Sequence, residues 1–292
     1  MELSGPRWKG KNYAQIANSN PMSEIIAQLQ VCLSNSESAA LPIGTDFLLE
    51  TEPELTDLFN CTSFGRQLKT SNGSKGYFQL SPEETFYLHH YLNCLKVLIN
   101  NANLINVNDL WNFMRSRNEL FPIYYRAYMH LRSKNWVVKS GTNNGVDYVV
   151  YRHHPELVHS EYAVIVDWEK ESGEKEGGRL RVWSDLHCAV RACNGVAKAV
   201  LLLNVMGYEV KFSLPELLER MTVGERQITR WLPSQCRDDC KLDNDVEADD
   251  IDVASDKNVI NHTTRYWVVP LQTQTQPEIG EEDSDYAPSM SL

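Results

Sequence analysis

The sequence predicts an α+β fold: a mainly helical N-terminal domain, then a mixed β-sheet flanked by helices, then an acidic C-terminal tail. Between residues 80 and 133, apolar residues recur at the three- and four-residue spacing of amphipathic helices. From Trp136 onward the pattern changes to short apolar runs between turn residues, which is typical of strands. The run Ala199–Met206 is almost entirely apolar, as expected of a strand covered on both faces. Helices and a sheet that follow one another in this way indicate the α+β class.

The N-terminal helices are predicted from capping residues and periodicity. A helix over Leu80–Leu98 has clear start signals, because Ser81 is a good N-cap and Pro82 fits the first helical position. The segment Pro21–Leu33 also has helical spacing. Two more helices are expected over residues 106–118 and 120–136.

Strand patterns begin at Trp136 and alternate with turns. The expected strands are Trp136–Gly141, Val146–Tyr151, His159–Trp168 and Ala199–Met206. Residues 169–178 are expected to form a charged loop. A helix is expected over Ser184–Asn194, with Ser184 as its N-cap. Further on, Thr263–Gln274 is expected to pair as an edge strand or to dock on a partner.

The negative charge is concentrated at the C-terminal end. The formal net charge is −11; residues 238–292 hold 14 acidic and 3 basic residues, and the rest of the chain holds 25 of each sign. Such an acidic composition predicts a largely disordered tail, while a neutral body can still carry a basic cleft. We therefore expect a poorly defined N-terminal region (1–75), a helical domain (76–133), a sheet domain that carries the activity (134–235) and the acidic tail (236–292).

Composition disfavours several classes of protein. No run of 18 apolar residues occurs, so no transmembrane helix is expected, and the first residues lack the apolar core of a signal peptide. The seven cysteines are irregularly spaced without a CxxC pair, which disfavours a disulfide framework and a zinc ribbon. Cys236 and Cys240 lack a second pair to complete a tetrahedral metal site. A reducing compartment, cytosolic or nuclear, is favoured.

Three histidines fall in the stretch "YRHHPELVHSEYAVIV", which starts at Tyr151. Histidine titrates near neutral pH and is therefore a candidate catalytic group. Tyr151 ends one expected strand and His159 begins the next, so both side chains can lie at the same edge of the sheet. Because strands hold side chains more precisely than loops, His159 is slightly preferred over His153 and His154, which are expected to lie exposed in the loop.

Four segments carry a resemblance to a known family: "LSPEETFYL", "RSKNWVVKSG", "GVDYVVYRHHPELVHSEYAVIV" and "VRACNGVAKAVLLLNV". From about Leu80 to Pro233, more than half of its length, the chain resembles the catalytic subunits of the tRNA-splicing (tRNA-intron) endonuclease. It is most similar to the eukaryotic subunit assigned to the 5′ splice site. Two departures stand out. The chain has His153-His154 where the family usually has a glycine before Pro155, and Asn144 where the family commonly has a tyrosine.

The resemblance implies an endoribonuclease with a catalytic Tyr151, His159 and Lys198, and without metal or cofactor. RNA carries its own nucleophile, the 2′-OH. The family implies that Tyr151 takes the proton of that hydroxyl, His159 protonates the leaving 5′-oxygen and Lys198 stabilises the charged phosphorane. With an ordinary pKa of about 10, only on the order of 0.1% of a tyrosine is ionised at pH 7. Whether Tyr151 is the base or only orients the 2′-OH therefore stays open.

The resemblance also implies substrate contacts and partners. Arg191 and Trp231 match an arginine and a tryptophan that hold a flipped intron base by cation–π stacking, for the active site of the partner catalytic subunit. The expected substrate is intron-containing pre-tRNA, and the expected assembly is a nuclear heterotetramer with a second catalytic subunit and two non-catalytic subunits. Candidate contacts to the RNA backbone are Arg132, Lys134, Lys139 and Arg152.

Two alternatives belong to other classes. In the first alternative the chain is a non-catalytic scaffold subunit of the same complex, which the intact set of Tyr151, His159 and Lys198 disfavours. In the second it is a metal-dependent nuclease. The second alternative would use Glu161 and Asp167 with a lysine on a similar sheet.

Overall fold

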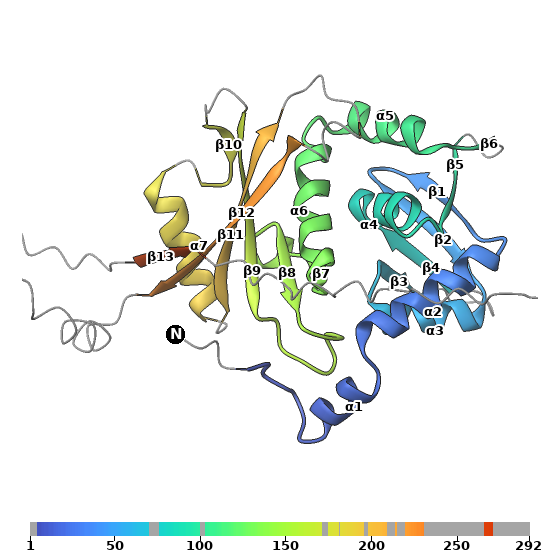
Figure 1. The fold of residues 1–292 in the computed structure, drawn as a ribbon, viewed down its shortest axis with the longest axis horizontal. Helices are drawn as coiled ribbons and strands as arrows, with labels where there is room; N and C mark the ends of the chain where they lie inside the picture. The colour runs from blue at the N-terminus through green and yellow to red at the C-terminus, as the bar shows by residue number, and fades with distance from the viewer. Residues whose placement is uncertain are drawn as a thin grey trace, which may run out of the picture.

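The computed structural model describes residues 5–69, 76–99, 103–170, 175–180, 182–195, 198–208, 214, 220–230 and 266–270. Within these ranges the chain forms two sheets, one in each half, with helices packed on them (Figure 1). This arrangement confirms the predicted α+β class. None of the helices in these ranges is long and apolar enough to cross a membrane.

The N-terminal half contains a mixed sheet that the prediction of a mainly helical domain did not include. Its strands run in the order β3-β4-β2-β1-β5-β6. Their bounds are β1 Ala39–Ile43, β2 Asp46–Thr51, β3 Arg66–Leu68, β4 Gly76–Leu80, β5 Lys96–Ile99 and β6 Asn103–Leu104. The helices of this part are α1 Tyr13–Ser19, α2 Met22–Asn35 and α3 Pro53–Thr62. Ordered elements therefore occupy much of the region that the sequence left undefined, and α2 confirms the predicted N-terminal helix.

The helix expected over Leu80–Leu98 is shorter than predicted. It begins as expected, because Ser81 and Glu84 form a capping box, and α4 covers Pro82–Phe86. A π-helical turn follows over Tyr87–Tyr91, and β5 then begins at Lys96. The chain leaves the helix at Asn93, whose φ of 49° is left-handed. The β-branched Val97 and Ile99 then favour the strand.

Two long helices connect the halves and confirm their predictions. They are α5 Val107–Arg117, capped by the side chain of Asn106, and α6 Phe121–Ser133. Phe86 is fully buried where α4, α5 and α6 meet. Its ring centroid lies 5.3 Å from that of Trp111, 5.7 Å from that of Phe121 and 4.8 Å from that of Tyr125. Aromatic packing therefore joins these helices.

The second sheet runs in the order β13-β12-β11-β9-β8-β7, and β10 pairs with β9. Its strands are β7 Val137–Ser140, β8 Tyr148–Tyr151, β9 Tyr162–Lys170, β10 Lys175–Gly178, β11 Ala199–Tyr208, β12 Thr222–Arg230 and β13 Tyr266–Pro270. All neighbouring strands are antiparallel except β9 and β11, which are parallel. The four predicted strands are present, β13 confirms the edge-strand alternative, and β12 was not predicted.

Two details of this half differ from the prediction. The strand β10 lies in the segment that was expected to be a charged loop, and it pairs with the end of β9. The helix α7, Trp183–Gly195, starts one residue before Ser184, so Ser184 is not its N-cap. The side chain of Asp185 instead accepts a hydrogen bond of 3.1 Å from the backbone N–H of Val182 and closes the first turn.

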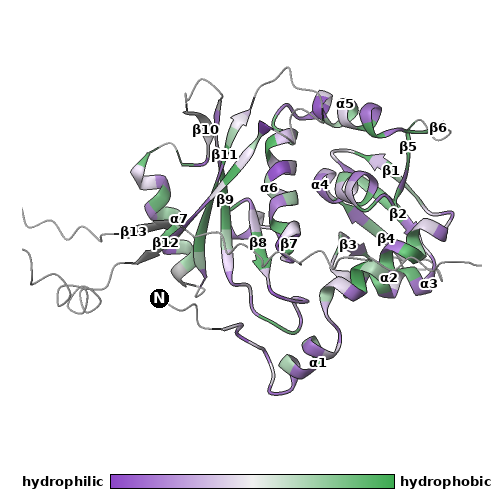
Figure 2. Cartoon of the chain, viewed as in Figure 1, coloured by the Kyte–Doolittle hydropathy of each residue, from purple (hydrophilic) through white to green (hydrophobic). Residues whose placement is uncertain are grey.

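The two faces of the second sheet are covered by different helices. Val150, Val164 and Leu201 point to the face that packs with α6 and the N-terminal core. Ala163 and Val200 point to the opposite face, together with the buried residues of α7. Figure 2 shows hydrophobic residues gathered along the central strands, whereas the segment ahead of α1 is largely hydrophilic.

Replacing Phe86 with alanine is expected to destabilise the fold strongly. The change removes a fully buried ring, and such Phe→Ala changes cost about 3–5 kcal/mol. Denaturant titration would measure the free energy of unfolding. The matched control is Val31→Ala, because Val31 is 61% exposed on α2 and should change stability by no more than about 0.5 kcal/mol. A loss below about 1 kcal/mol for Phe86→Ala would contradict this packing.

Candidate active site

The pairing of three strands brings the predicted catalytic residues to one end of the second sheet. Tyr151 is the last residue of β8, and the preceding Val150 pairs with Tyr162 of β9. Tyr162 in turn pairs with Ala199 of β11, the residue after Lys198. Backbone bonds continue this register, since the N–H of Glu161 donates to Val150 O at 2.9 Å and the N–H of Ala199 donates to Glu161 O at 3.2 Å.

Tyr151 is half-buried at this sheet end. Burial raises the pKa of Tyr151, and the nearby side chain of Ser160 opposes that rise. Ser160 is itself buried and directly follows His159. The Tyr151 hydroxyl is therefore protonated at neutral pH and is held beside the chain segment that carries His159.

His159 is exposed, and its backbone rather than its ring is fixed. The N–H of His159 donates to the carbonyl of Arg7 at 2.9 Å. An exposed imidazole on a fixed backbone is free to meet a substrate from solvent. This suits a group that gives a proton to a leaving oxygen of the substrate.

Lys198 is partly buried between the end of α7 and the start of β11. Its backbone N–H donates to Cys193 O at 3.0 Å, and its ammonium donates to Asn144 Oδ1 at 3.2 Å. Asn144 lies in the turn between β7 and β8, where it replaces a tyrosine common in the resembled family. Among the residues that the structure describes, no hydrogen bond links Tyr151, His159 and Lys198 to one another; they share only the end of the sheet.

The loop histidines do not lie exposed as expected. His153 is only 7% exposed, and its Nε2 lies 2.8 Å from the carbonyl of Asn20 at the end of α1. The Nε2 of His154 lies 2.9 Å from the carbonyl of Asn60 in α3, and its Nδ1 accepts from the N–H of Glu156. Both rings therefore anchor the loop to the N-terminal helices; His153 is buried, His154 is half-buried and His159 is exposed.

Of the two residues predicted to hold an intron base, Arg191 and Trp231, the structure describes only the first. Arg191 is exposed on α7, as a residue that reaches a substrate must be. Trp231 lies outside the described residues.

The four candidate RNA contacts divide into two groups. Arg132 and Lys139 both contact the N-terminal half: Arg132 is 4% exposed with its guanidinium 4.1 Å from the centroid of the Phe64 ring, and Lys139 donates to Gly65 O at 2.8 Å. Burial also lowers the pKa of Lys139. Both link the two halves of the chain. Arg132 is buried, so its role as an RNA contact was a wrong expectation, whereas Lys139 is partly exposed.

The other two basic residues remain available, although each has a protein partner. Lys134 forms an ion pair with Glu225 at 2.9 Å. Arg152 forms a two-pronged ion pair with Glu161, with distances of 2.8 and 3.1 Å, and stacks 4.1 Å from the centroid of the Trp136 ring. Their side chains are more than a third exposed.

The acidic pair proposed for a metal does not converge. Glu161 directly precedes β9 and Asp167 lies six residues along the extended chain, so their Cα atoms are roughly 20 Å apart at about 3.3 Å per residue. Oxygen ligands lie about 2.0–2.6 Å from a bound Mg²⁺ or Ca²⁺. These two carboxylates therefore cannot hold one ion, and Glu161 is already paired with Arg152.

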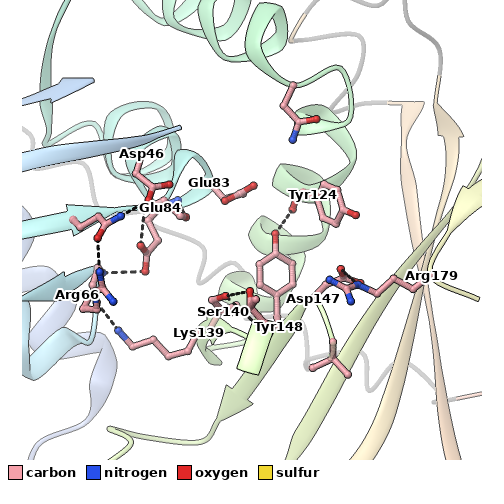
Figure 3. Close-up of a pocket in the computed structure, with 17 residues that line it drawn as sticks. Asp46, Arg66, Glu83, Glu84, Tyr124, Lys139, Ser140, Asp147, Tyr148 and Arg179 are labelled. Carbon is pink, nitrogen blue, oxygen red and sulfur yellow. Dashed lines mark hydrogen bonds and ion pairs between the residues drawn. The ribbon is translucent and has the colours of Figure 1, made fainter. Parts of the chain in front are cut away.

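A cavity of about 730 Å³ lies elsewhere, between the two halves (Figure 3). The residue of β8 that lines this cavity is Tyr148, at the opposite end of the strand from Tyr151. Its charged groups are largely paired with the protein, for example Arg179 with Asp147 at 2.8 Å and Glu84 with the backbone of Gly65 at 3.0 Å. This cavity is therefore separate from the candidate catalytic residues.

Sequence patterns did not identify three residues that position the site: Arg7, Asn144 and Ser160. Ser160 adjoins His159, which is a local signal that pattern reading did not use. Arg7 is more than 150 positions from its partners, so no local pattern links it to them. Asn144 was visible only as a departure from the resembled family.

Comparison with known proteins confirms the resemblance. Residues 121–212 match the family model described as "tRNA intron endonuclease, catalytic C-terminal domain", and residues 43–111 match "tRNA intron endonuclease, N-terminal domain". A rice protein named "Probable tRNA-splicing endonuclease subunit Sen2" is 43% identical over 90% of this chain and 92% of its own length. The Arabidopsis thaliana "tRNA-splicing endonuclease subunit Sen2-2" is 44% identical over 80% of this chain and 92% of its own. A "tRNA-splicing endonuclease" of the archaeon Saccharolobus islandicus is 30% identical over 45% of this chain.

The two family models together cover more than half of the chain, and the match to the catalytic domain includes Tyr151, His159 and Lys198. The plant relatives match over nearly their whole length. The chain therefore belongs to the tRNA intron endonuclease family and is an endoribonuclease that carries both domains of that family.

Proposed function

We propose that this chain is the catalytic subunit that cuts intron-containing pre-tRNA at the 5′ splice site without a metal ion. The observation that carries the proposal is the shared end of β8, β9 and β11, at which a tyrosine, an exposed histidine and a lysine lie. These three groups can supply the proton transfers and the positive charge that the reaction needs.

In this mechanism the 2′-oxygen attacks the neighbouring phosphorus while the bond from phosphorus to the 5′-oxygen breaks. His159 gives its proton to the departing 5′-oxygen, and Lys198 stabilises the negative charge on the phosphorane. The products are a 2′,3′-cyclic phosphate and a 5′-hydroxyl. Lys198 would exchange Asn144 Oδ1, a neutral partner, for a charged phosphorane oxygen, which is the stronger hydrogen-bond acceptor.

The surroundings of Tyr151 favour one of its two open roles. Because burial raises its pKa, the ionised fraction at neutral pH is even smaller than the ordinary value of about 0.1%. We therefore propose that Tyr151 remains protonated and orients the 2′-OH by a hydrogen bond. The proton of the 2′-OH then passes to a non-bridging phosphate oxygen or to water as the new P–O bond forms.

The names of the plant relatives support a role within a complex, because each is called a subunit. We propose that the chain works in a nuclear heterotetramer with a second catalytic subunit and two non-catalytic subunits. Arg191 and Trp231 would then hold an intron base for the partner's active site. A purely scaffolding role remains the alternative, and cleavage by the assembled complex tests it.

Replacing His159 with alanine is expected to slow the 5′ cut by about 10²–10⁴-fold, the usual contribution of a general acid. The control is Glu156→Ala, which shortens an exposed side chain of the same loop. Single-turnover rates in the assembled complex would be measured for both variants. Equal losses in both would contradict His159 as the acid. His153 is unsuitable as a control because it is buried.

Removal of metal ions is expected to leave the cleavage intact. The proposed acid, orienting hydroxyl and cation are all side chains, so EDTA should not stop the 5′ cut once the pre-tRNA has folded. Cleavage of pre-folded substrate would be followed with and without EDTA. Complete loss in EDTA, with recovery on addition of Mg²⁺, would favour a metal-dependent mechanism.

Replacing Arg191 with alanine is expected to slow the cut that this subunit does not make. Cation–π contacts contribute about 0.5–2 kcal/mol, so the 3′ cut should slow roughly 2- to 30-fold, since 1.4 kcal/mol is tenfold. The 5′ cut should be largely spared. Cys188→Ala is the matched control, because Cys188 is exposed one turn earlier on α7. Equal slowing of both cuts in an intact complex would contradict the proposal that Arg191 serves the active site of the partner subunit.

A further inference from the structure

We propose that residues Arg7–Lys9, here called the strap, are a positioning element that holds the His159 segment in its catalytic conformation. The inference rests on the proposed function, because it concerns the geometry of the proposed acid. It assigns a catalytic contribution to a segment that lies outside both matched family domains.

The strap lies against the loop as a short antiparallel pair. Trp8 and Val158 form a β-bridge. On one side of it the N–H of His159 donates to Arg7 O at 2.9 Å, and on the other the N–H of Lys9 donates to Leu157 O at 2.9 Å. The strap therefore fixes the backbone of His159 directly.

The Arg7 side chain adds a further contact beyond His159. Its Nη2 donates to Ser160 O at 3.2 Å, and Ser160 is the residue whose side chain lowers the pKa of the nearby Tyr151. The bridge residue Val158 is 1% exposed, so the segment is also held by burial. Together these contacts fix the residues on both sides of His159 while its own side chain remains exposed.

The loop needs such support because it has no strand of its own. Between the end of β8 and the start of β9, its main chain bonds to the strap and within the loop itself, and two of its side chains reach helices of the N-terminal half. His153 meets Asn20 O at 2.8 Å, and His154 meets Asn60 O at 2.9 Å. Because a displacement of about 1 Å can slow catalysis by about 10², loss of the strap should affect the chemical step.

The strap has an alternative role that the experiment must separate. Residues 5–23 carry three basic side chains and no acidic one, so the segment is suited to contact RNA phosphates. A phosphate contact would act on RNA binding and would weaken with salt. A positioning contact would act on the cleavage rate.

The test compares Lys9→Pro with Lys9→Ala in the assembled complex. Both variants remove the same positive charge, but only proline lacks the N–H that donates to Leu157 O. Proline also favours an extended conformation in the preceding residue, which suits the bridge at Trp8. We expect Lys9→Pro to slow the single-turnover 5′ cut by about 10- to 100-fold with the Kd for pre-tRNA unchanged. Lys9→Ala should stay within about twofold of the wild-type rate, since it keeps the backbone bond.

Hydrogen exchange provides a readout that does not depend on activity. In the wild-type complex the amide of His159 should be protected, and Lys9→Pro should speed exchange in a peptide that spans residues 152–161 while peptides from β9 and β11 stay unchanged.

The inference is overturned if Lys9→Pro cuts at the wild-type rate. It is also overturned if both variants lose RNA affinity equally, because that result assigns the segment to phosphate binding. Failure of the wild-type complex to cut pre-tRNA would instead reject the proposed function itself.

Discussion

The parallel pairing of β9 with β11 is the constraint on which the rest of the catalytic half depends. Ala199 pairs with Tyr162, and the register continues without interruption as far as Met206 and Glu169. Parallel strands cannot be joined by a tight turn, so a crossover must connect them. The crossover contains β10 and α7, which places α7 on one face of the sheet and leaves the other face to α6. Because Lys198 directly precedes β11, the same connection delivers it to the end of the sheet where Tyr151 lies.

The two halves of the chain are joined by buried polar groups as well as by aromatic packing. Arg132 donates to the Tyr128 hydroxyl at 2.8 Å and stacks on Phe64, which comes from the N-terminal half. Lys139 reaches Gly65 O across the same junction. A buried charge is costly unless it is well placed, so these groups favour a single arrangement of the two halves. That arrangement also positions the candidate site, because the loop before His159 takes its anchors from the N-terminal half.

Sequence patterns predicted the parts of the fold whose signals are local. The capping box at Ser81 and the apolar run Ala199–Met206 carried enough information to locate a helix start and a central strand. Patterns did not reveal the strands of the N-terminal sheet, because short strands such as β3 and β6 are defined by their partners rather than by periodicity. They also extended the helix from Leu80 past its end at Tyr91, because the apolar spacing continues into β5.

The candidate site shows the same division. Tyr151 and His159 were placed at one sheet edge by strand order alone, and Lys198 was added by resemblance to a family. The contacts that hold them were not predictable, since Arg7 and Asn144 act over long sequence separations. His153 looked like an exposed loop residue because its partner, the carbonyl of Asn20, belongs to a distant helix end.

The late position of β13 in the chain has a consequence for synthesis. This five-residue strand covers the free edge of β12, although it begins roughly 40 residues further along the chain. An uncovered edge presents unpaired N–H and C=O groups and is a template for aggregation. At a synthesis rate of about 5–20 residues per second, β12 would wait several seconds on the ribosome before its own partner arrives. During that interval another protein that adds a strand to the same edge would compete with β13, so the timing of translation would influence which pairing forms first.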